Sequence, residues 1–529
     1  MPPALPMLAS RPMVRVCCTL AMLHFSSALP AKIAGNPFAL TTWYVNPANQ
    51  REIDSSIKTA SGAVKQTLTT MRGIPSAYWI DKKSKINGQT TDTLEGILAD
   101  AASKLTAPLV AFIIYNLPNR DCDAGASNGE ICCTTAANSS TCDYMASGAC
   151  EDGLNEYKHL YIDPIAAVLT RYAKRIPMAI IIEPDSLPNL ATNTGVPGCG
   201  NAATHAAYTQ GVSYAVNTLK GAAPSAAIYL DAAHGGWLGW QNNARKYATL
   251  VASLGITQHL RGFTSNVANY QALGAACPPE AFTMGGGLPQ YCKTHKGATC
   301  CADPCHLLSQ YNFGNGEYNY VQLMTSTVAG VTNGWTPHWL IDTGRNGVAD
   351  ERSDCSDWCN IRNAGAGRRP TTNTSLPSLV DALFWLKTPG ESDGCTQTLP
   401  DGSACPRFDP MCATPDAIGS RSGEPRAPAA GAWFDYQVKQ LAQNAKLDSM
   451  PPAVHTSPPI AAVSAFAAPF GNCYGDSDPC LGGYYCHGAV VEGVGVCMPT
   501  AATIASRGQN AVFNTALEHA LHRSLPLSG

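Results

Sequence analysis

Carboxylates follow several apolar segments of this sequence at the points where those segments end. The stretch IIIEPDSLPNL, residues 180–190, places Glu183 and Asp185 directly after three isoleucines. Asp121 lies in NRDC after another apolar run, and Asp393 lies in GESDG. A pair of carboxyl groups, one protonated and one ionised, can perform general acid–base chemistry on a bound substrate. Because unpaired buried charge is costly, such repetition predicts a cleft with Asp185 at its floor.

Aromatic residues lie in polar, glycine-rich segments of the same kind. DAAHGGWLGW contains His234, Trp237 and Trp240, CSDWCN contains Trp358, and SAYWID contains Trp79. A flat indole fits the apolar face of a pyranose ring, while neighbouring polar side chains can hydrogen-bond its hydroxyls. A core position is the alternative for any one tryptophan, but four in such segments favour a sugar-binding cleft.

Seven short apolar runs position these residues. They occupy residues 76–81, 109–115, 178–184, 226–231, 260–266, 337–342 and 381–387. Helical patterns, such as 156–175 and 205–222, separate them. Strands that are apolar on both faces and alternate with helices predict an α/β fold, a TIM-like parallel (β/α) barrel that is closed or nearly so. In such barrels the segments after the strands carry the chemistry. Here those segments contain Asp81, Asp121, Glu183, Asp185, Asp231, His234, Asn269, Asp342, Arg345, Lys387, Glu391 and Asp393.

The N-terminus is typical of a secretory signal. Arg11 and Arg15 precede a short apolar run and the small residues SSALPA, which predicts a signal peptide over 1–31 and a secreted, extracellular protein. An ordinary apolar N-terminal helix is the alternative. No later stretch is long and apolar enough for a membrane helix. Charged residues make up 14% of the chain and the net charge is -3, which argues against nucleic-acid or anionic-membrane partners.

The cysteines fit an oxidising compartment. Of the 22, Cys17 and Cys18 fall in the signal, which leaves an even number for a disulfide framework. Adjacent pairs at 132–133 and 300–301 raise the alternative of a metal cluster, but few histidines stand at ligand spacing, and we expect no metal or cofactor. Sequons at Asn138 and Asn373 predict glycosylation.

Composition divides the chain into segments. We expect a catalytic domain over 36–447, a Pro/Ala/Ser-rich linker over 448–470, a small four-cysteine module over 471–499 and a tail over 500–529.

From residue 36 to about 447 the chain resembles glycoside hydrolase family six, the secreted cellulases. The segments that carry the resemblance are GNPF, SAYWID, YNLPNRDCDAGASNGE, IIEPDSLPNLATN, YLDAAHGGWLGW, RGFTSNVANY, DTGRNG, DWCN, LKTPGESDG and RFDPMCATPDA…AGAWF. The resemblance implies a distorted seven-stranded barrel that hydrolyses β-1,4-glucan with inversion, on cellulose and cello-oligosaccharides.

Inversion requires an acid for the leaving oxygen and room for a water on the opposite face, with roughly 6.5–9.5 Å between carboxyls. The resemblance implies that Asp185 is the general acid, with a raised pKa, and that Asp121 is the carboxylate beside it. An ion pair of Asp121 with Arg120 or another arginine is the alternative. Asp393 stands where the family has its candidate base, and direct base action or charge stabilisation alone both remain open. Ser127 would help to hold the water.

The remaining implied contacts are with sugar. Tyr115 would lie beside the distorted sugar ring, and the substrate-binding residues would be Trp79, Asp81, His234, Trp237, Trp240, Asn269, Trp358, Lys387 and Glu391. Asn116 and Asn119 replace aspartates of better-known fungal relatives, which is expected to lower the pKa of Asp185 and to change the acid limb of the pH profile. Thr388 and Ser392 replace a proline and a cysteine.

The resemblance also implies disulfides Cys122–Cys199 and Cys359–Cys412. Extra cysteines fall in three insertions, 132–150, 277–305 and 395–405, and their pairing is left open. The four-cysteine module loosely resembles the small fungal cellulose-binding module, with Tyr474, Tyr484 and Tyr485 as a flat aromatic face. A plain disulfide-knotted tail is the alternative.

Long segments follow Asp121 and Asp393. In the family, such loops cover the cleft of chain-end enzymes, so we expect a tunnel and a cellobiohydrolase. An open-cleft endoglucanase is the first alternative. A secreted carbohydrate-binding protein without activity is the second, and the three retained aspartates argue against it. We expect a monomer.

Overall fold

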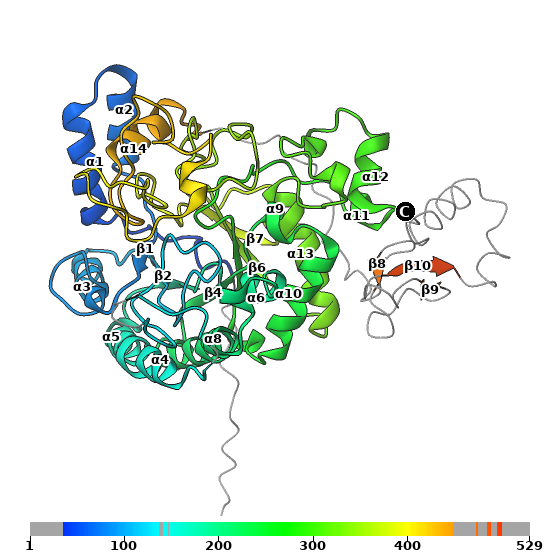
Figure 1. The fold of residues 1–529 in the computed structure, drawn as a ribbon, viewed down its shortest axis with the longest axis horizontal. Helices are drawn as coiled ribbons and strands as arrows, with labels where there is room; N and C mark the ends of the chain where they lie inside the picture. The colour runs from blue at the N-terminus through cyan, green and yellow to red at the C-terminus, as the bar shows by residue number, and fades with distance from the viewer. Residues whose placement is uncertain are drawn as a thin grey trace, which may run out of the picture.

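Seven parallel strands form the centre of the molecule. The computed structural model describes residues 35–136, 141–146 and 148–448, with three strands near the C-terminus. The central strands are β1 (Tyr78–Ile80), β2 (Val110–Ile114), β3 (Met178–Ile182), β4 (Ala227–Asp231), β5 (Gly262–Ser265), β6 (His338–Asp342) and β7 (Val380–Phe384). They pair in chain order, each parallel to the next. Figure 1 shows β1, β2, β4, β6 and β7 at the centre of the molecule, among the helices. All seven strands expected from the sequence are therefore confirmed.

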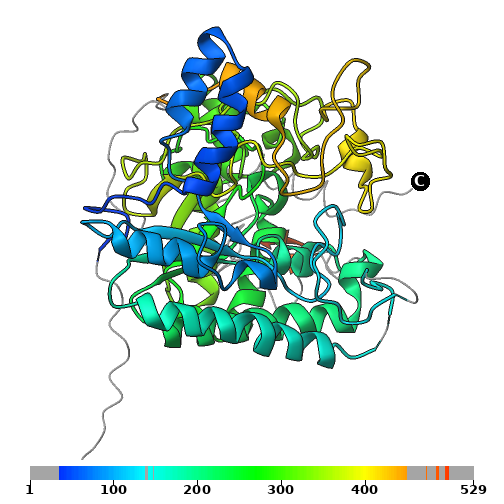
Figure 2. The ribbon, with the colours of Figure 1, turned by 90° about the vertical axis from the view of Figure 1, so that its left-hand side faces the viewer.

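Helices surround this sheet. The α-helices are α1 (Pro47–Thr59), α2 (Gly62–Met71), α3 (Leu94–Ser103), α4 (Glu151–Glu156), α5 (Asp163–Tyr172), α6 (Ser186–Thr192), α7 (Pro197–Gly200), α8 (Ala202–Ala222), α9 (Gly235–Leu238), α10 (Gln241–Ser253), α11 (Glu280–Thr283), α12 (Gly287–Thr294), α13 (Glu317–Val331) and α14 (Asp435–Gln443). Shorter turns are η1 (Lys83–Lys85), the π-helical η2 (Tyr157–Ile162), η3 (Thr257–His259), η4 (Thr299–Cys301), η5 (Leu308–Gln310) and η6 (Pro410–Ala413). Figure 2 shows the blue helices α1 and α2 beside the orange α14, so segments that lie far apart in the sequence pack together there.

The sheet curls until its edge strands approach each other. Ser76, just before β1, forms a parallel bridge with Trp385, just after β7. The Ala77 N–H donates to the Trp385 carbonyl at 2.9 Å, and the Trp79 indole N–H donates to the Leu386 carbonyl, also at 2.9 Å. These few contacts, in place of a full ladder, give the distorted seven-stranded barrel that the resemblance implied.

Alternate residues of each strand pack on opposite faces, as the period of two requires. Ile180 and Ile182 belong to the larger core between the sheet and the outer helices. Ala179 and Ile181 belong to the smaller core inside the barrel, where Tyr229 also lies. Small and large residues together fill the interior, so the barrel is a packed core that supports side chains at its C-terminal rim.

Within the described residues, eight disulfides brace the segments around this rim. Both bonds expected from the resemblance, Cys122–Cys199 and Cys359–Cys412, are present. The remaining pairs are Cys132–Cys142, Cys133–Cys150, Cys277–Cys300, Cys292–Cys301, Cys305–Cys355 and Cys395–Cys405. Both adjacent cysteine pairs therefore form interleaved disulfides, which confirms the disulfide bonds expected for these cysteines.

The C-terminal module contributes a three-stranded antiparallel sheet. Its strands β8 (Asn472–Cys473), β10 (Gly495–Pro499) and β9 (Tyr484–His487) lie in that order. Several features expected from the sequence lie outside the described residues: the signal peptide, nearly all of the linker, the tail, Asn138 and Tyr474. Asn373 is exposed, as a glycosylation site must be. Among the described residues, no helix has the length and apolar character to cross a membrane.

Candidate active site

Two carboxylates follow β3, and the structure gives them different surroundings. Glu183 is buried and accepts hydrogen bonds from the N–H groups of Asn116 and Leu117 and from the Tyr157 hydroxyl at 2.8 Å. Burial raises the pKa of Glu183 to about 7, against the effect of these donors. Glu183 therefore holds the segment after β2 in place, and Asp185 is left for chemistry.

Asp185 caps the start of α6 in a left-handed conformation, with φ of 63°. This conformation is uncommon for a residue other than glycine and often occurs at functional sites. The Asp185 N–H donates to Oδ2 of Asp231, at the end of β4, at 2.9 Å. Burial, then the charges of Asp231 and Asp121, raise the pKa of the Asp185 carboxyl well above its ordinary value. Asp185 can therefore hold a proton at pH values where an exposed aspartate would be ionised.

Asp121 occupies a second left-handed position, with φ of 62°, on the segment after β2. Its Oδ2 accepts the N–H of Ser127 at 2.6 Å and the Ser127 hydroxyl at 3.1 Å. The same Ser127 oxygen lies 3.1 Å from the Tyr115 hydroxyl. Burial raises the pKa of Asp121, and the Ser127 bonds oppose that rise. Tyr115, Ser127 and Asp121 thus form a connected polar chain.

Arg120 supports this segment without pairing with Asp121. Its guanidinium donates to the carbonyl oxygens of Ser127 at 2.8 Å, Asp81 at 3.1 Å and Tyr115. The Cζ atom of Arg120 lies 4.2 Å from the centroid of the Tyr115 ring. Within the described residues no ion pair joins Asp121 to an arginine, so the expected alternative for Asp121 is not found.

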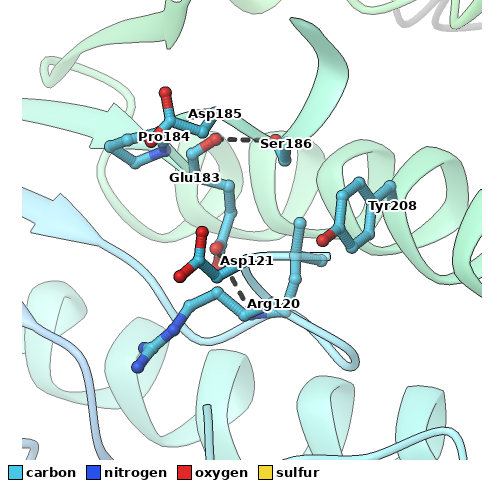
Figure 3. Close-up of a pocket in the computed structure, with 8 residues that line it drawn as sticks. Arg120, Asp121, Glu183, Pro184, Asp185, Ser186 and Tyr208 are labelled. Atoms are coloured by element: carbon cyan, nitrogen blue, oxygen red, sulfur yellow. Dashed lines mark hydrogen bonds between the residues drawn. The ribbon is translucent and has the colours of Figure 1, made fainter. Parts of the chain in front are cut away.

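Asp121 and Asp185 line the same small pocket (Figure 3). Its lining consists of Leu117, Arg120, Asp121, Glu183, Pro184, Asp185, Ser186 and Tyr208. Two different strand ends, after β2 and β3, thus bring a pair of carboxyls with raised pKa values to one place. Such a pair fits acid–base chemistry on a bound substrate.

Asp393 is buried, and both of its carboxylate oxygens accept hydrogen bonds. Its carboxylate accepts two hydrogen bonds from Arg345, at 2.7 and 2.8 Å, one from the Tyr270 hydroxyl at 2.8 Å and one from the Asn360 N–H at 2.8 Å. The Cζ atom of Arg345 also lies 4.3 Å from the centroid of the Tyr270 ring. Sequence patterns identified Arg345 as a strand-end residue without giving it a role. The structure makes it the counter-ion of Asp393.

Aromatic and charged residues gather where β1 meets β7. The Trp79 ring lies edge-on to Tyr115 at 5.2 Å, and Nζ of Lys387 lies 5.1 Å from the centroid of Trp79. Lys387 also donates to Glu391 at 3.0 Å. Asp81 pairs with Lys85 at 2.7 Å. Burial would raise the pKa of Asp81, but Lys85 outweighs it and the pKa is lowered. This group joins an indole face to charged hydrogen-bonding side chains.

The other predicted sugar contacts follow β4, β5 and β6. Trp237 lies edge-on to His234 at 6.2 Å and donates its indole N–H to Thr192 at 2.7 Å. Burial, then the nearby Arg352, lowers the pKa of His234 to about 3, so its ring is neutral at ordinary pH. Trp240 donates to the Gln310 carbonyl at 3.0 Å.

Two further predicted contacts complete this side. The Asn269 side chain accepts from the N–H of Tyr270 at 2.7 Å. Trp358 is partly buried between Cys355 and Cys359.

Comparison with known proteins relates this geometry to a family. The sequence profile of Glycosyl hydrolases family 6 matches residues 38–445. Exoglucanase 3 of Agaricus bisporus is 36% identical over 417 residues, which cover 78% of this chain and 79% of that protein. The 1,4-β-D-glucan cellobiohydrolase C of Emericella nidulans is 34% identical over 425 residues, with coverage of 78% and 79%.

Solved structures agree. The catalytic core domain of the cellobiohydrolase Cel6A from Chaetomium thermophilum is 32% identical, with a TM-score of 0.60 over 78% of this chain and 99% of that one. The catalytic domain of CcCel6A, solved with p-nitrophenyl β-D-cellotrioside, is 32% identical, with a TM-score of 0.62 over 78% of this chain and 98% of that one. The profile match spans the barrel and the pocket that holds Asp121 and Asp185. This chain therefore belongs to glycoside hydrolase family 6.

Proposed function

We propose that this protein hydrolyses the β-1,4-glucosidic bonds of cellulose with inversion and releases cellobiose from chain ends. The environment of Asp185 carries the proposal. A general acid must keep its proton until the leaving oxygen takes it, and burial with two neighbouring carboxyls raises the pKa of Asp185 for that role. The relatives named above are exoglucanases and cellobiohydrolases, which supports the same substrate and product.

Asp121 is proposed to stabilise positive charge on the sugar as the glucosidic bond breaks. A carboxylate close to the anomeric carbon lowers the energy of an oxocarbenium-like transition state. Ser127, which binds Asp121 through both its N–H and its hydroxyl, is proposed to orient the attacking water. Tyr115 shares the Ser127 hydroxyl and limits the space beside the sugar ring.

For Asp393 we propose charge stabilisation over direct proton abstraction. Its two oxygens already accept four hydrogen bonds, two of them from the adjacent Arg345 guanidinium. A carboxylate so engaged has little capacity to accept a proton from water. The proton would then leave through a chain of water molecules that begins at Ser127.

Chain-end action is supported by contact between the two long segments that follow β2 and β7. Gly394 packs against Ala126, and a Cβ added at Gly394 would lie 3.1 Å from the Cβ of Ala126. Contact between these segments would cover the sugar-binding residues, so that a glucan must enter by its end. We also propose that the protein is secreted and monomeric, and the eight disulfides of the described residues fit an oxidising compartment.

Proton NMR of purified protein with cellohexaose tests the reaction. Spectra taken within minutes, before the new anomers equilibrate, should show fresh α-anomer with cellobiose as the dominant product. Fresh β-anomer would contradict inversion, a mixed ladder of oligomers would favour the endoglucanase, and an absence of hydrolysis would favour a binding protein.

A further inference from the structure

Arg407 joins two segments that lie far apart in the sequence. It belongs to the segment after β7, and its Nη1 donates to the carbonyl of Asn128, in the segment after β2, at 2.6 Å. Within the described part of the chain this is the one hydrogen bond of the Arg407 side chain, and no ion pair engages it. The side chain is only partly buried. The connection can therefore break and re-form without disturbing the core.

The receiving side of this bond is tied to the acid pair. The Asn128 side chain donates to the carbonyls of Arg120 at 3.2 Å and Asp121 at 3.1 Å and to the Tyr144 hydroxyl at 2.7 Å. Ser127, the preceding residue, holds the Asp121 carboxylate. The position of the Asn128 carbonyl is therefore coupled to the turn that carries Asp121.

Disulfides hold the chain in place on both sides of Arg407. Cys395–Cys405 closes a short hairpin two residues earlier, and its backbone bonds include the Cys405 N–H to the Gln397 carbonyl at 2.9 Å. Cys359–Cys412 anchors the chain five residues later. Because both flanks are fixed, the bond to Asn128 orders few additional torsions when it forms. The cysteines of the 395–405 hairpin belong to the insertions noted in the sequence, so this brace is an addition to the family pattern.

Charged residues of both segments lie near Arg407. Burial and then the nearby Arg120 lower the pKa of Arg407, while the charges of Asp81 and Asp121 oppose that shift. Asp409, on the same segment as Arg407, is buried, and burial followed by the charges of Asp121 and Asp123 raises its pKa to about 6. Negative charges of the two segments thus oppose each other, and Arg407 places a cation where the segments meet.

We propose that the hydrogen bond from Arg407 to the Asn128 carbonyl holds the two segments together over the sugar-binding residues. We call this bond the latch, and we propose that it determines the preference for chain ends over internal bonds. This inference rests on the proposed function. While the latch is formed, a glucan can enter the site only by its end. When the latch is broken, the segments separate and a glucan can bind along its length.

Three variants of the full-length protein test the latch. Arg407→Ala removes the donor, and Arg407→Lys keeps a cation with fewer donors. Arg421→Ala is the matched control, because Arg421 is an exposed arginine of the same segment that bonds only within it, to the Pro415 carbonyl at 3.4 Å. Carboxymethyl cellulose is the diagnostic substrate, since its bulky substituents prevent threading through a closed passage. Cellohexaose measures the basal activity.

The ratio of activity on carboxymethyl cellulose to that on cellohexaose should rise about three- to tenfold for Arg407→Ala, less for Arg407→Lys and not at all for Arg421→Ala. Hydrogen exchange should increase at residues 122–130 in Arg407→Ala, with melting temperature nearly unchanged. An unchanged ratio together with unchanged exchange would overturn the latch.

The two proposals fail in different ways. If the wild-type protein releases cellobiose while Arg407→Ala keeps the same ratio, only the latch is wrong. If the wild-type protein already gives a mixed ladder and degrades carboxymethyl cellulose freely, chain-end action is wrong and so is the role of Arg407 in it.

Discussion

The backbone N–H of Asp185 donates a hydrogen bond of 2.9 Å to Oδ2 of Asp231, which belongs to the neighbouring strand. The bond fixes the turn that carries Asp185 and brings a second carboxyl beside it. Asp231 also accepts from the Ala233 N–H at 3.2 Å and the Thr264 hydroxyl at 3.2 Å. Burial raises the pKa of Asp231 to about 6 against the effect of these donors, so above that pH Asp231 supplies negative charge that makes Asp185 harder to ionise.

Asp231→Asn should therefore move the alkaline limb of the pH–rate profile to lower pH. The limb reports loss of the proton from the general acid, and removing the charge of Asp231 lowers the pKa of Asp185. We expect a shift of about one pH unit, measured as kcat on cellohexaose. Asp231→Glu, which keeps the charge, is the control. An alkaline limb at the wild-type position in Asp231→Asn would show that Asp231 does not tune the acid.

Trp79→Ala should weaken substrate binding at the junction of β1 and β7. Loss of the indole face removes an apolar platform, so the KM for cellohexaose should rise about tenfold. Trp79→Phe keeps an aromatic face but loses the N–H bond to Leu386, and should restore most of the KM at some cost in melting temperature. Trp43→Phe is the control, because Trp43 packs on the same inner core and also donates its indole N–H to a main-chain carbonyl, that of Phe38 at 3.2 Å. Equal KM values for all variants would remove Trp79 from the binding site.

Stability should fall as the pH rises from about 4.5 to about 8. Burial raises the pKa of Glu317 from 4.5 to about 8 and that of Glu183 to about 7. Over this range the unfolded chain ionises these carboxyls while the folded protein keeps their protons. The folded state therefore binds more protons, and the free energy of unfolding decreases with pH.

Glu317→Gln should flatten this dependence. The amide can still accept the Gly235 N–H, now at 2.9 Å from Oε1, and it cannot ionise. Calorimetry should give matching melting temperatures at pH 4.5 and a variant that is more stable by about 2 °C or more at pH 8. Melting curves that stay parallel across the range would contradict the raised pKa of Glu317.

The strands were predictable because their physical signal is local. A run such as residues 178–182, apolar at every position, fits a strand buried on both faces, and the structure confirms it. Two disulfides followed from the family resemblance. The pairing of Cys305 with Cys355 could not be predicted, because 50 residues separate them and the spacing of cysteines alone does not determine which meet.

The resemblance assigned the acid role to Asp185, but the structural role of Glu183 could not be predicted from the sequence. It depends on N–H groups of the segment after β2, which reach Glu183 only once the strands are side by side. Asn119 is similar. Its side chain accepts from the Cys133 N–H at 2.9 Å and donates to the Thr204 hydroxyl at 3.1 Å, which an ionised carboxylate could not do. The asparagine at this position thus has a structural role beside the effect on pH dependence that the resemblance led us to expect.

The general-acid role of Asp185 is tested most directly by Asp185→Asn on two substrates with different leaving groups. On cellohexaose, whose leaving oxygen needs a proton, kcat should fall by about a thousandfold or more. On β-cellobiosyl fluoride, whose leaving group needs little protonation, the variant should keep most of the wild-type rate, and the alkaline limb of its pH profile should disappear. Equal losses on both substrates would contradict the assignment of Asp185 as the general acid.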